Sequence, residues 1–276
     1  MSIQSLSIVV PGRKCINNCE FCVSRTHSDI KYKNSSQFGQ YERSLLYAKD
    51  LGCTTLMLTG ECEPQQNMPF VENFLMNHLT LFHNIEIQTT GRGLDAQSIS
   101  KLAMMGVNTF SISMASFDQI NNSQIINQLQ DVIEVFNICK YIKANNLLLR
   151  LSLNLNDEFY NYSPAELFHK CKNYYGADQV TLRMLYKPNK VCSQSEWIDK
   201  HVDHNKDLEY FDYIKSYGDK LETLPYGKAK YSVDGVGTVA DDDCMAKANH
   251  NDIRYLILRP DGHLYTRWDD PASIIR

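Results

Sequence analysis

The sequence has 276 residues, of which 43% are hydrophobic and 22% charged, proportions typical of one large globular domain or of a domain with a short appendage. The formal net charge is −4 and there is no run of lysines or arginines, which weighs against a general nucleic-acid-binding protein. The amino terminus lacks the pattern of a secretory signal, and no apolar run reaches the ~20 residues of a membrane helix. We therefore expect a cytosolic protein whose nine cysteines are reduced thiols or metal ligands rather than disulfides.

Strand-like and helix-like segments alternate along the chain as far as Tyr186, an order typical of parallel strands connected by helices. Alternation of apolar and polar residues predicts six strands, at residues 6–10, 54–59, 85–90, 109–115, 148–155 and 180–185. Helices are predicted in the gaps between them. In the fourth gap, the stripe of Ile126, Leu129, Ile133 and Phe136 predicts a single helix. The fold class is therefore expected to be α/β.

The alternating strands also predict which face of the sheet is polar. Apolar residues must face the covering helices, so the polar residues point toward the axis of a barrel. These inward residues are Glu86, Gln88, Thr90, Ser111, Ser113, Arg150, Ser152, Asn154, Thr181 and Arg183. A closed eight-stranded barrel usually fills its interior with branched apolar side chains, so we interpret this polar interior as a ligand cavity. The alternative is an open sheet with one solvated face.

After residue 186 the pattern is weaker. Residues 187–204 are polar, residues 208–217 are a candidate helix, and the acidic run at residues 240–243 is expected in a solvated loop. Two predicted strands, at residues 254–258 and 263–268, flank Pro260-Asp261-Gly262, which is a strong hairpin turn signal. We therefore divide the chain into a barrel core at residues 1–186 and an extension at residues 187–276, which caps the barrel and ends in this hairpin.

Three cysteines follow the first predicted strand directly, with the spacing C-x3-C-x2-C. Cys15, Cys19 and Cys22 are candidate ligands for three irons of a [4Fe–4S] cluster, whose fourth iron would have no protein ligand. A structural zinc site is the main alternative, with His27 as a candidate fourth ligand. A group of cysteines that serves only packing is the third interpretation.

The cysteine motif, with the aromatic Phe21 just before its last cysteine, resembles the signature of the radical S-adenosylmethionine (SAM) superfamily. The resemblance implies a partial (β/α)6 TIM barrel of radical SAM type. It also implies that SAM binds the open iron and that an electron from the reduced cluster cleaves SAM, giving methionine and a 5′-deoxyadenosyl radical that abstracts hydrogen from a substrate. An electron donor such as flavodoxin or ferredoxin is implied as a partner.

Later segments are similar to other motifs of the same family. Residues 58–64, Leu-Thr-Gly-Glu-Cys-Glu-Pro, resemble its T-G-x-G-E-P motif, with Cys62 where a glycine is usual. The resemblance implies that Glu63 and a preceding carbonyl receive the SAM ammonium group. Residues 88–91 and 111–115 are similar to the T-T-N-G and S-L-D segments of the family. The residues assigned to SAM in this way are Phe21, Gly60, Cys62, Glu63, Gln88, Thr90, Ser113, Arg150, Ser152 and Asn154. Arg183 is assigned to the SAM carboxylate, to a substrate anion or to an ion pair with Glu86.

The carboxyl-terminal segment resembles an incomplete SPASM or twitch extension, which peptide-modifying members of the family carry. Cys244 and the predicted hairpin match, but Thr266-Arg267-Trp268 stands where the next cysteine is usual, so we expect a single cluster. Residues 267–270 are expected either to reach the substrate or to be solvated. Most of the dispersed cysteines are expected to be buried small hydrophobes. These are Cys53, Cys62, Cys139, Cys171, Cys192 and Cys244.

The sequence therefore predicts an enzyme that binds one [4Fe–4S] cluster and SAM, and that abstracts hydrogen from a small polar metabolite, a nucleoside or a peptide. An activase of glycyl-radical enzymes is the enzymatic alternative. A non-catalytic iron–sulfur or zinc protein is the alternative from another class. Neither nucleic acid nor a membrane is expected as a partner.

Overall fold

The computed structural model of the chain describes residues 3–12, 14–24, 38–224, 228–242, 253, 255–268 and 270–276. The predictions for His27, Cys244, Asp269 and the first position of the strand at residues 254–258 lie outside these residues. No helix within the described ranges is both long enough and apolar enough to cross a membrane.

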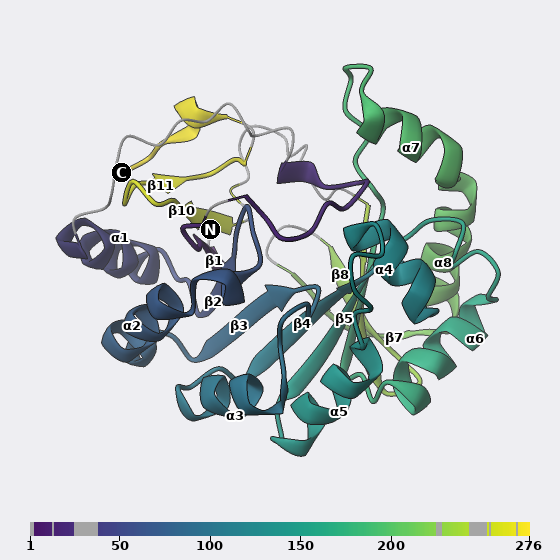
Figure 1. Ribbon diagram of the computed structural model, residues 1–276, viewed down its shortest axis with the longest axis horizontal. Coiled ribbons are helices and arrows are strands. Elements are labelled where there is room, and N and C mark those ends of the chain that lie inside the picture. The colour runs from purple at the N-terminus through teal and green to yellow at the C-terminus, as the bar shows by residue number, and fades with distance from the viewer. Residues whose placement is uncertain are drawn as a thin grey trace.

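The first part of the chain builds six parallel strands with helices between them (Figure 1). The strands are β1 Ser5–Val9, β2 Thr55–Thr59, β3 Asn84–Thr89, β4 Thr109–Met114, β5 Leu148–Asn154 and β6 Gln179–Arg183. The helices are α1 Phe38–Asp50, α2 Met68–His78, α3 Ala96–Met104, α4 Gln119–Asn127, α5 Val135–Ala144 and α6 Pro164–His169. All six predicted strands are confirmed, each to within two residues of its predicted ends.

The fourth connection holds two helices, α4 and α5, so the prediction of a single helix there is wrong. α4 ends at Asn127, and the next residues, Gln128 and Leu129, take left-handed backbone conformations with φ of 57° and 54°. The Asn127 side chain donates to the carbonyl of Asp131 at 3.0 Å and to its carboxylate at 2.7 Å. Side-chain bonds of this kind compete with the helical ladder, which is why the apolar stripe does not form one helix.

The two faces of the sheet differ as predicted. Phe110 and Ile112 of β4 and Leu151 of β5 are buried in the main hydrophobic core, and Figure 1 shows α1, α2, α3, α5 and α6 along the outside of the curved sheet. The inner face lines a cavity of about 350 Å³. Among the lining residues are Ser7, Glu86, Gln88, Arg150, Thr181 and Arg183. The predicted polar interior is therefore confirmed.

Residues that follow β6 extend the same sheet at both edges. Helices α7 Ser193–His201 and α8 His204–Tyr217 lead into β7 Asp219–Thr223, β8 Ala229–Val233 and β9 Val236–Asp241, which are joined in antiparallel pairs. β9 pairs parallel with β6, and β10 Tyr255–Leu258 pairs parallel with β1 and antiparallel with β11 Leu264–Tyr265. The strand order is β11-β10-β1-β2-β3-β4-β5-β6-β9-β8-β7, and the parallel part forms a partial barrel.

Several predictions for this second part can be compared with the structure. The helix at residues 208–217 lies within α8, and β10 and β11 confirm the hairpin, with Gly262 at a φ of +82° in its turn. The expected solvated loop at residues 240–243 is wrong for Ala240 and Asp241, because these residues belong to β9 and pair with Leu182 and Arg183 of β6. The division at residue 186 stays a prediction, and the sheet continues across it.

Candidate functional site

The cysteine motif lies on the loop after β1, at the edge where the parallel strands end. Cys15, Cys19 and Cys22 are free thiols that are partly exposed to solvent. Burial raises the pKa of Cys15 and of Cys19, and the nearby Cys22 raises both pKa values further. The three thiols share one short loop, where uncompensated thiolates are unfavourable. A metal centre reverses this preference, because its positive charge deprotonates the thiols that coordinate it.

The donor groups of an iron–sulfur cluster and of a zinc site are arranged differently. A structural zinc needs four ligands around one point, whereas the sulfurs around a cubane bind different irons and stand further apart. In the part of the chain that the structure describes, no group of three or more His, Cys, Asp or Glu side chains is placed to hold one metal ion. His27, the candidate fourth zinc ligand, lies outside the described residues.

Distant parts of the chain hold the cysteine loop in place. The backbone N–H of Asn18 donates to the carbonyl of Ile126 in α4 at 2.9 Å. On the other side, Gln66 accepts from the N–H of Ile16 at 3.0 Å through its side-chain oxygen. Gln66 belongs to a short 3₁₀ helix, Pro64–Asn67, that follows the second motif. The loop is therefore fixed against both α4 and the segment after β2.

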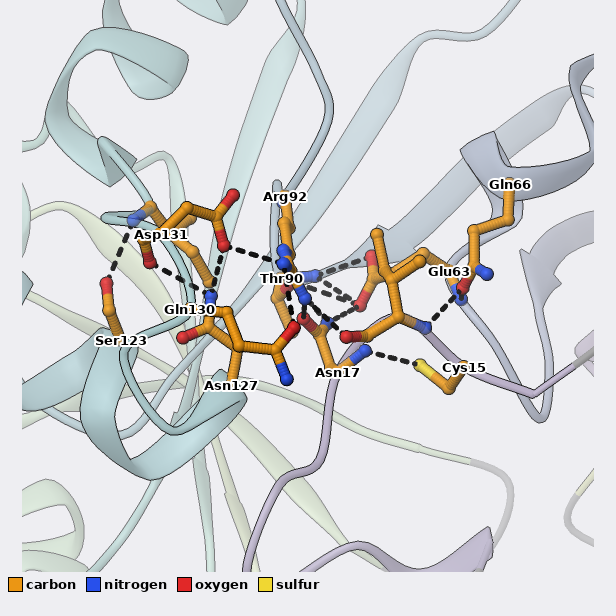
Figure 2. Close-up of polar contacts among 12 residues, drawn as sticks. Cys15, Asn17, Glu63, Gln66, Thr90, Arg92, Ser123, Asn127, Gln130 and Asp131 are labelled. Carbon is orange, nitrogen blue, oxygen red and sulfur yellow. Dashed lines mark hydrogen bonds and ion pairs between the residues drawn. The ribbon is translucent and has the colours of Figure 1, made fainter.

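Glu63 lies buried beneath the cysteine loop, and Figure 2 shows the polar groups around it. Its Oε1 accepts from Asn17 Nδ2 at 2.7 Å and from Thr90 Oγ1 at 3.0 Å. Its Oε2 accepts from Gln65 Nε2 at 3.0 Å, from the Thr90 N–H at 3.1 Å and from the Thr89 hydroxyl. Burial raises the pKa of Glu63, and these hydrogen bonds oppose the rise. The carboxylate therefore joins the cysteine loop, the end of β2 and the end of β3.

Arg92 makes a second link between the cysteine loop and the rest of the site (Figure 2). Its guanidinium donates to the carbonyl of Ile16 and lies 3.4 Å from Asn17 Oδ1. The same group donates to Gln130 Oε1 at 3.2 Å and forms an ion pair with Asp131 at 2.7 Å. Because Asp131 is also held by Asn127, this chain of contacts ties the loop after β3 to the break between α4 and α5.

The second motif approaches the cysteine loop closely. A Cβ atom on Gly60 would lie 3.2 Å from the backbone of Val10, and one on Gly12 would lie 2.2 Å from the sulfur of Cys62. Cys62 is not among the residues with positive φ, so its backbone does not require the glycine that is usual in the motif. Its thiol instead fills the space above Gly12. We conclude that Gly12 and Cys62 form a matched pair.

The inner-face residues on β3, β4 and β5 that were assigned to SAM contact other residues of the sheet. Arg150 forms an ion pair with Glu86 at 2.6 Å and donates to Gln179. Gln88 donates to Glu86 at 3.0 Å, and Asn154 donates to the carbonyl of Met114 at 3.2 Å. Ser113 of β4 pairs in register with Ser152 of β5.

Arg183 has different partners from the ion pair considered above. Glu86 is paired with Arg150, so the pairing of Glu86 with Arg183 is wrong. Arg183 Nε donates to Ser152 Oγ at 2.7 Å, and Nη1 lies 3.5 Å from Asp241. The strand order explains this difference. β4 and β5 separate β3, which carries Glu86, from β6, which carries Arg183, whereas β9, which carries Asp241, is the direct neighbour of β6.

The sequence pattern did not reveal that α7 contacts the cysteine motif. Gln194 is buried and donates to the carbonyl of Phe21 at 3.2 Å. The rings of Phe21 and Trp197 lie 5.8 Å apart between centroids. Residues 187–204 are polar without regular apolar spacing, and they carried no signal for this contact beyond the single aromatic Trp197.

These features are shared with a known family of enzymes. The chain belongs to the radical SAM superfamily, whose family model matches residues 9–154, more than half of the sequence. Enzymes of this family use a [4Fe–4S] cluster and SAM. The matched region of this chain contains the cysteine loop, Glu63 and Thr90.

Solved structures share the fold. SuiB from Streptococcus suis bound to S-adenosylmethionine is similar with a TM-score of 0.64 and 16% identity, over 96% of this chain and 60% of SuiB. anSMEcpe with bound AdoMet gives a TM-score of 0.62 and 11% identity, over 97% of this chain and 75% of anSMEcpe. Coproporphyrinogen III oxidase (HemN) from Escherichia coli, described as a radical SAM enzyme, gives a TM-score of 0.52 and 14% identity, over 80% of this chain and 55% of HemN. The chain thus spans about 60% of the length of SuiB. No curated protein matches the sequence significantly.

Proposed function

We propose that Cys15, Cys19 and Cys22 hold the cluster and that the enzyme abstracts hydrogen from a polar substrate bound in the cavity on the inner face of the sheet. The observation that carries this proposal is the trio of neighbouring thiols on a loop already fixed by Glu63 and Arg92. When bound, the cluster and SAM supply the one-electron chemistry and the 5′-deoxyadenosyl radical. The protein's part is to hold the cofactors and the substrate in fixed positions.

The residues around the cysteine loop are the proposed walls of the SAM site. Gly60 keeps the segment after β2 close to Val10, which gives the SAM ammonium access to backbone carbonyls of the second motif. The Glu63 oxygens already accept from five donors and offer only about four lone-pair sites, so its proposed contact with the SAM ammonium replaces one of these hydrogen bonds. Phe21, Cys62 and Thr90 complete this part of the proposed site.

The inner-face residues are the proposed continuation of the SAM site toward the substrate. They are Gln88, Ser113, Arg150, Ser152 and Asn154, with Arg183 at the end of β6. SuiB was solved bound to the precursor peptide SuiA, which supports a peptide as the substrate. A small polar metabolite, a nucleoside or a glycyl-radical partner protein is the alternative. We also propose flavodoxin or ferredoxin as the electron donor.

Metal analysis of protein purified without oxygen tests this proposal. We expect about four irons and four sulfides per chain, an electron paramagnetic resonance signal of the reduced cluster that changes when SAM is added, and release of 5′-deoxyadenosine with a strong reductant. Cys19→Ala should lose the cluster. The matched control Cys53→Ala, a buried cysteine outside the motif, should keep it. One stoichiometric zinc without iron, or a cluster signal that ignores SAM, would contradict the proposal.

A further inference from the structure

The cavity on the inner face is lined by charged side chains, and not all of them have a close partner of opposite charge. Its volume of about 350 Å³ lies at the small end of the range for ligand pockets. Four cationic and three anionic side chains line it. They are Arg150, Arg183, Lys228 and Lys230, and Glu86, Glu222 and Asp241. Arg150 and Lys228 each lie 2.6 Å from a carboxylate of this group, and Lys230 lies 3.3 Å from Glu222.

Arg150 and Lys228 are closely paired within or beside the cavity. Arg150 lies 2.6 Å from Glu86 and also donates twice to Gln179, so its guanidinium already makes three close polar contacts. Lys228 lies 2.6 Å from Asp241 and 2.6 Å from Asp242, whose side chain lies largely in solvent. The carboxylate of Asp241 is therefore already compensated by Lys228.

Arg183 is held more loosely than Arg150. Its short bond, at 2.7 Å, is to the neutral hydroxyl of Ser152. The nearest carboxylate among the described residues, that of Asp241, is 3.5 Å away, whereas charge-assisted bonds of this kind are typically about 2.7–2.9 Å long. About a third of the Arg183 side chain is exposed. Arg183 is thus the lining guanidinium with room for a further acceptor.

The position of Arg183 places that acceptor at the same edge of the sheet as the cysteine loop. Arg183 is the last residue of β6 and pairs in register with Asn154 of β5. It lies at the carboxyl edge of the parallel strands, the same edge from which the cysteine loop leaves β1. Gln88, which also lines the cavity, is followed by Thr89 and Thr90 of the Glu63 network. Through Arg183, the cavity therefore reaches the edge of the sheet at which the cysteine loop begins.

We propose that Arg183 binds a carboxylate group of the substrate in this cavity. A carboxylate matches one spare guanidinium better than a phosphate dianion, because it carries a single charge and two coplanar oxygens that fit the planar guanidinium. The amide of Gln88 and the hydroxyls of Ser7 and Thr181 line the same cavity and suit the polar remainder of an amino acid or a peptide. This inference rests on the proposed function, and it specifies the chemistry of the substrate rather than its identity.

Equilibrium binding to the anaerobic, cluster-loaded, SAM-bound enzyme tests the inference. The probes are a panel of small aliphatic carboxylates, glutamate, N-acetylglutamyl peptide amides and the corresponding primary amides, followed by ligand-observed nuclear magnetic resonance. We expect carboxylates to bind and their amides not to bind. Glutamate binding more tightly than the peptide amides would indicate a free acid, and the reverse order would indicate a carboxylate carried on a peptide.

Variants connect the binding to Arg183. Arg183→Gln should weaken carboxylate binding at least tenfold, while the matched control Lys230→Gln, which removes the same charge from the same cavity, should weaken it less than threefold. Asp241→Asn should strengthen it, because it removes the competing carboxylate, whereas a purely structural role of the Arg183–Asp241 pair predicts weakening. Arg183→Lys, which keeps the charge, provides a second measurement should Arg183→Gln fold poorly, and it should give an intermediate affinity.

Three outcomes would overturn the inference. These are equal binding of carboxylates and amides, equal effects of Arg183→Gln and Lys230→Gln, or loss of SAM affinity in Arg183→Gln, which would assign Arg183 to the SAM carboxylate. Release of 5′-deoxyadenosine by the same preparation is measured separately. Its presence together with failed carboxylate binding overturns only this inference, and its absence overturns the proposed function.

Discussion

The network under the cysteine loop and the charged inner face at β5, β6 and β9 are built in opposite ways. In the first region Glu63 is buried and bonded on both oxygens, Asn17 donates to it at 2.7 Å, and Arg92 lies 2.7 Å from Asp131. In the second region the Arg183–Asp241 pair is 3.5 Å long and partly exposed to solvent. A site that positions a metal cofactor needs fixed ligands, whereas a site that admits a substrate needs groups free to change partners. The contrast predicts that substitutions in the first region cost far more stability than those in the second.

The largest effect is expected from Glu63→Ala. Removing the carboxylate leaves Asn17, Gln65, Thr89 and Thr90 without their shared acceptor in a buried place, which should lower the free energy of unfolding by about 4 kcal/mol. Chemical denaturation measures this loss, and iron content measures the loss of the cluster. The control Glu61→Ala, an exposed glutamate of the same segment, should change the stability by less than about 0.5 kcal/mol. Equal losses in the two variants would refute the central role of Glu63.

Asn17→Asp should be nearly as damaging, although it preserves the shape of the side chain. The change replaces a donor that lies 2.7 Å from Glu63 Oε1 with a second carboxylate, so a hydrogen bond becomes a repulsion. We expect a loss of about 3 kcal/mol and an iron content well below that of the native enzyme. Asn18→Asp, one position along the loop, serves as the comparison. A native iron content in Asn17→Asp would show that the contact with Glu63 does not shape the loop.

A smaller effect is expected from Arg92→Met, which keeps the length of the side chain and removes its donors. Loss of the bonds to Ile16 and Gln130 and of the ion pair with Asp131 should cost about 2 kcal/mol, because the Arg92 side chain is only 14% exposed. The iron should also leave the protein faster during gel filtration. The control Lys101→Met removes an exposed cation paired with Glu72 and should be close to neutral. Faster iron loss in both variants would point to a general charge effect.

The smallest effect on stability is expected from Arg183→Gln. Its ion pair is long and partly exposed, so the free energy of unfolding should fall by less than about 0.5 kcal/mol and the iron content should stay unchanged. Denaturation midpoints measured beside those of Arg92→Met would sharpen the contrast between the two regions. A loss as large as that of Arg92→Met would show that the inner face is as rigid as the loop network.

The sequence predicted the first six strands well because their pattern reflects burial directly. Phe110, Ile112 and Met114 are buried in β4 as the alternation requires. The strands β7 and β8 were missed because this signal is absent there: every residue of β7 is exposed, and four of the five residues of β8 are partly exposed. They form because β9 pairs with β6 and offers its free edge to β8. Tertiary context of this kind is invisible to local patterns.

The residues of the candidate site also differ in whether a local sequence signal reveals them. The spacing of Cys15, Cys19 and Cys22 and the sequence around Glu63 are local signals, and the structure brings the two segments into contact through Asn17. Arg92 and Gln194 were not found, because each acts on the loop across a long stretch of chain. An ion pair of Glu86 with Arg183 was one of three alternatives for that arginine, whereas Glu86 pairs with Arg150, because a polar pattern shows that residues share a face but not which of them meet.

The parallel pairing of β10 with β1 has a consequence for biosynthesis. The strand that carries the cysteine loop is paired on one side with β2 and on the other with Tyr255–Leu258, near the far end of the sequence. In a nascent chain on the ribosome, one edge of β1 therefore lacks its hydrogen-bonding neighbour until those late residues have emerged. Iron delivery to the loop should accordingly follow translation rather than accompany it.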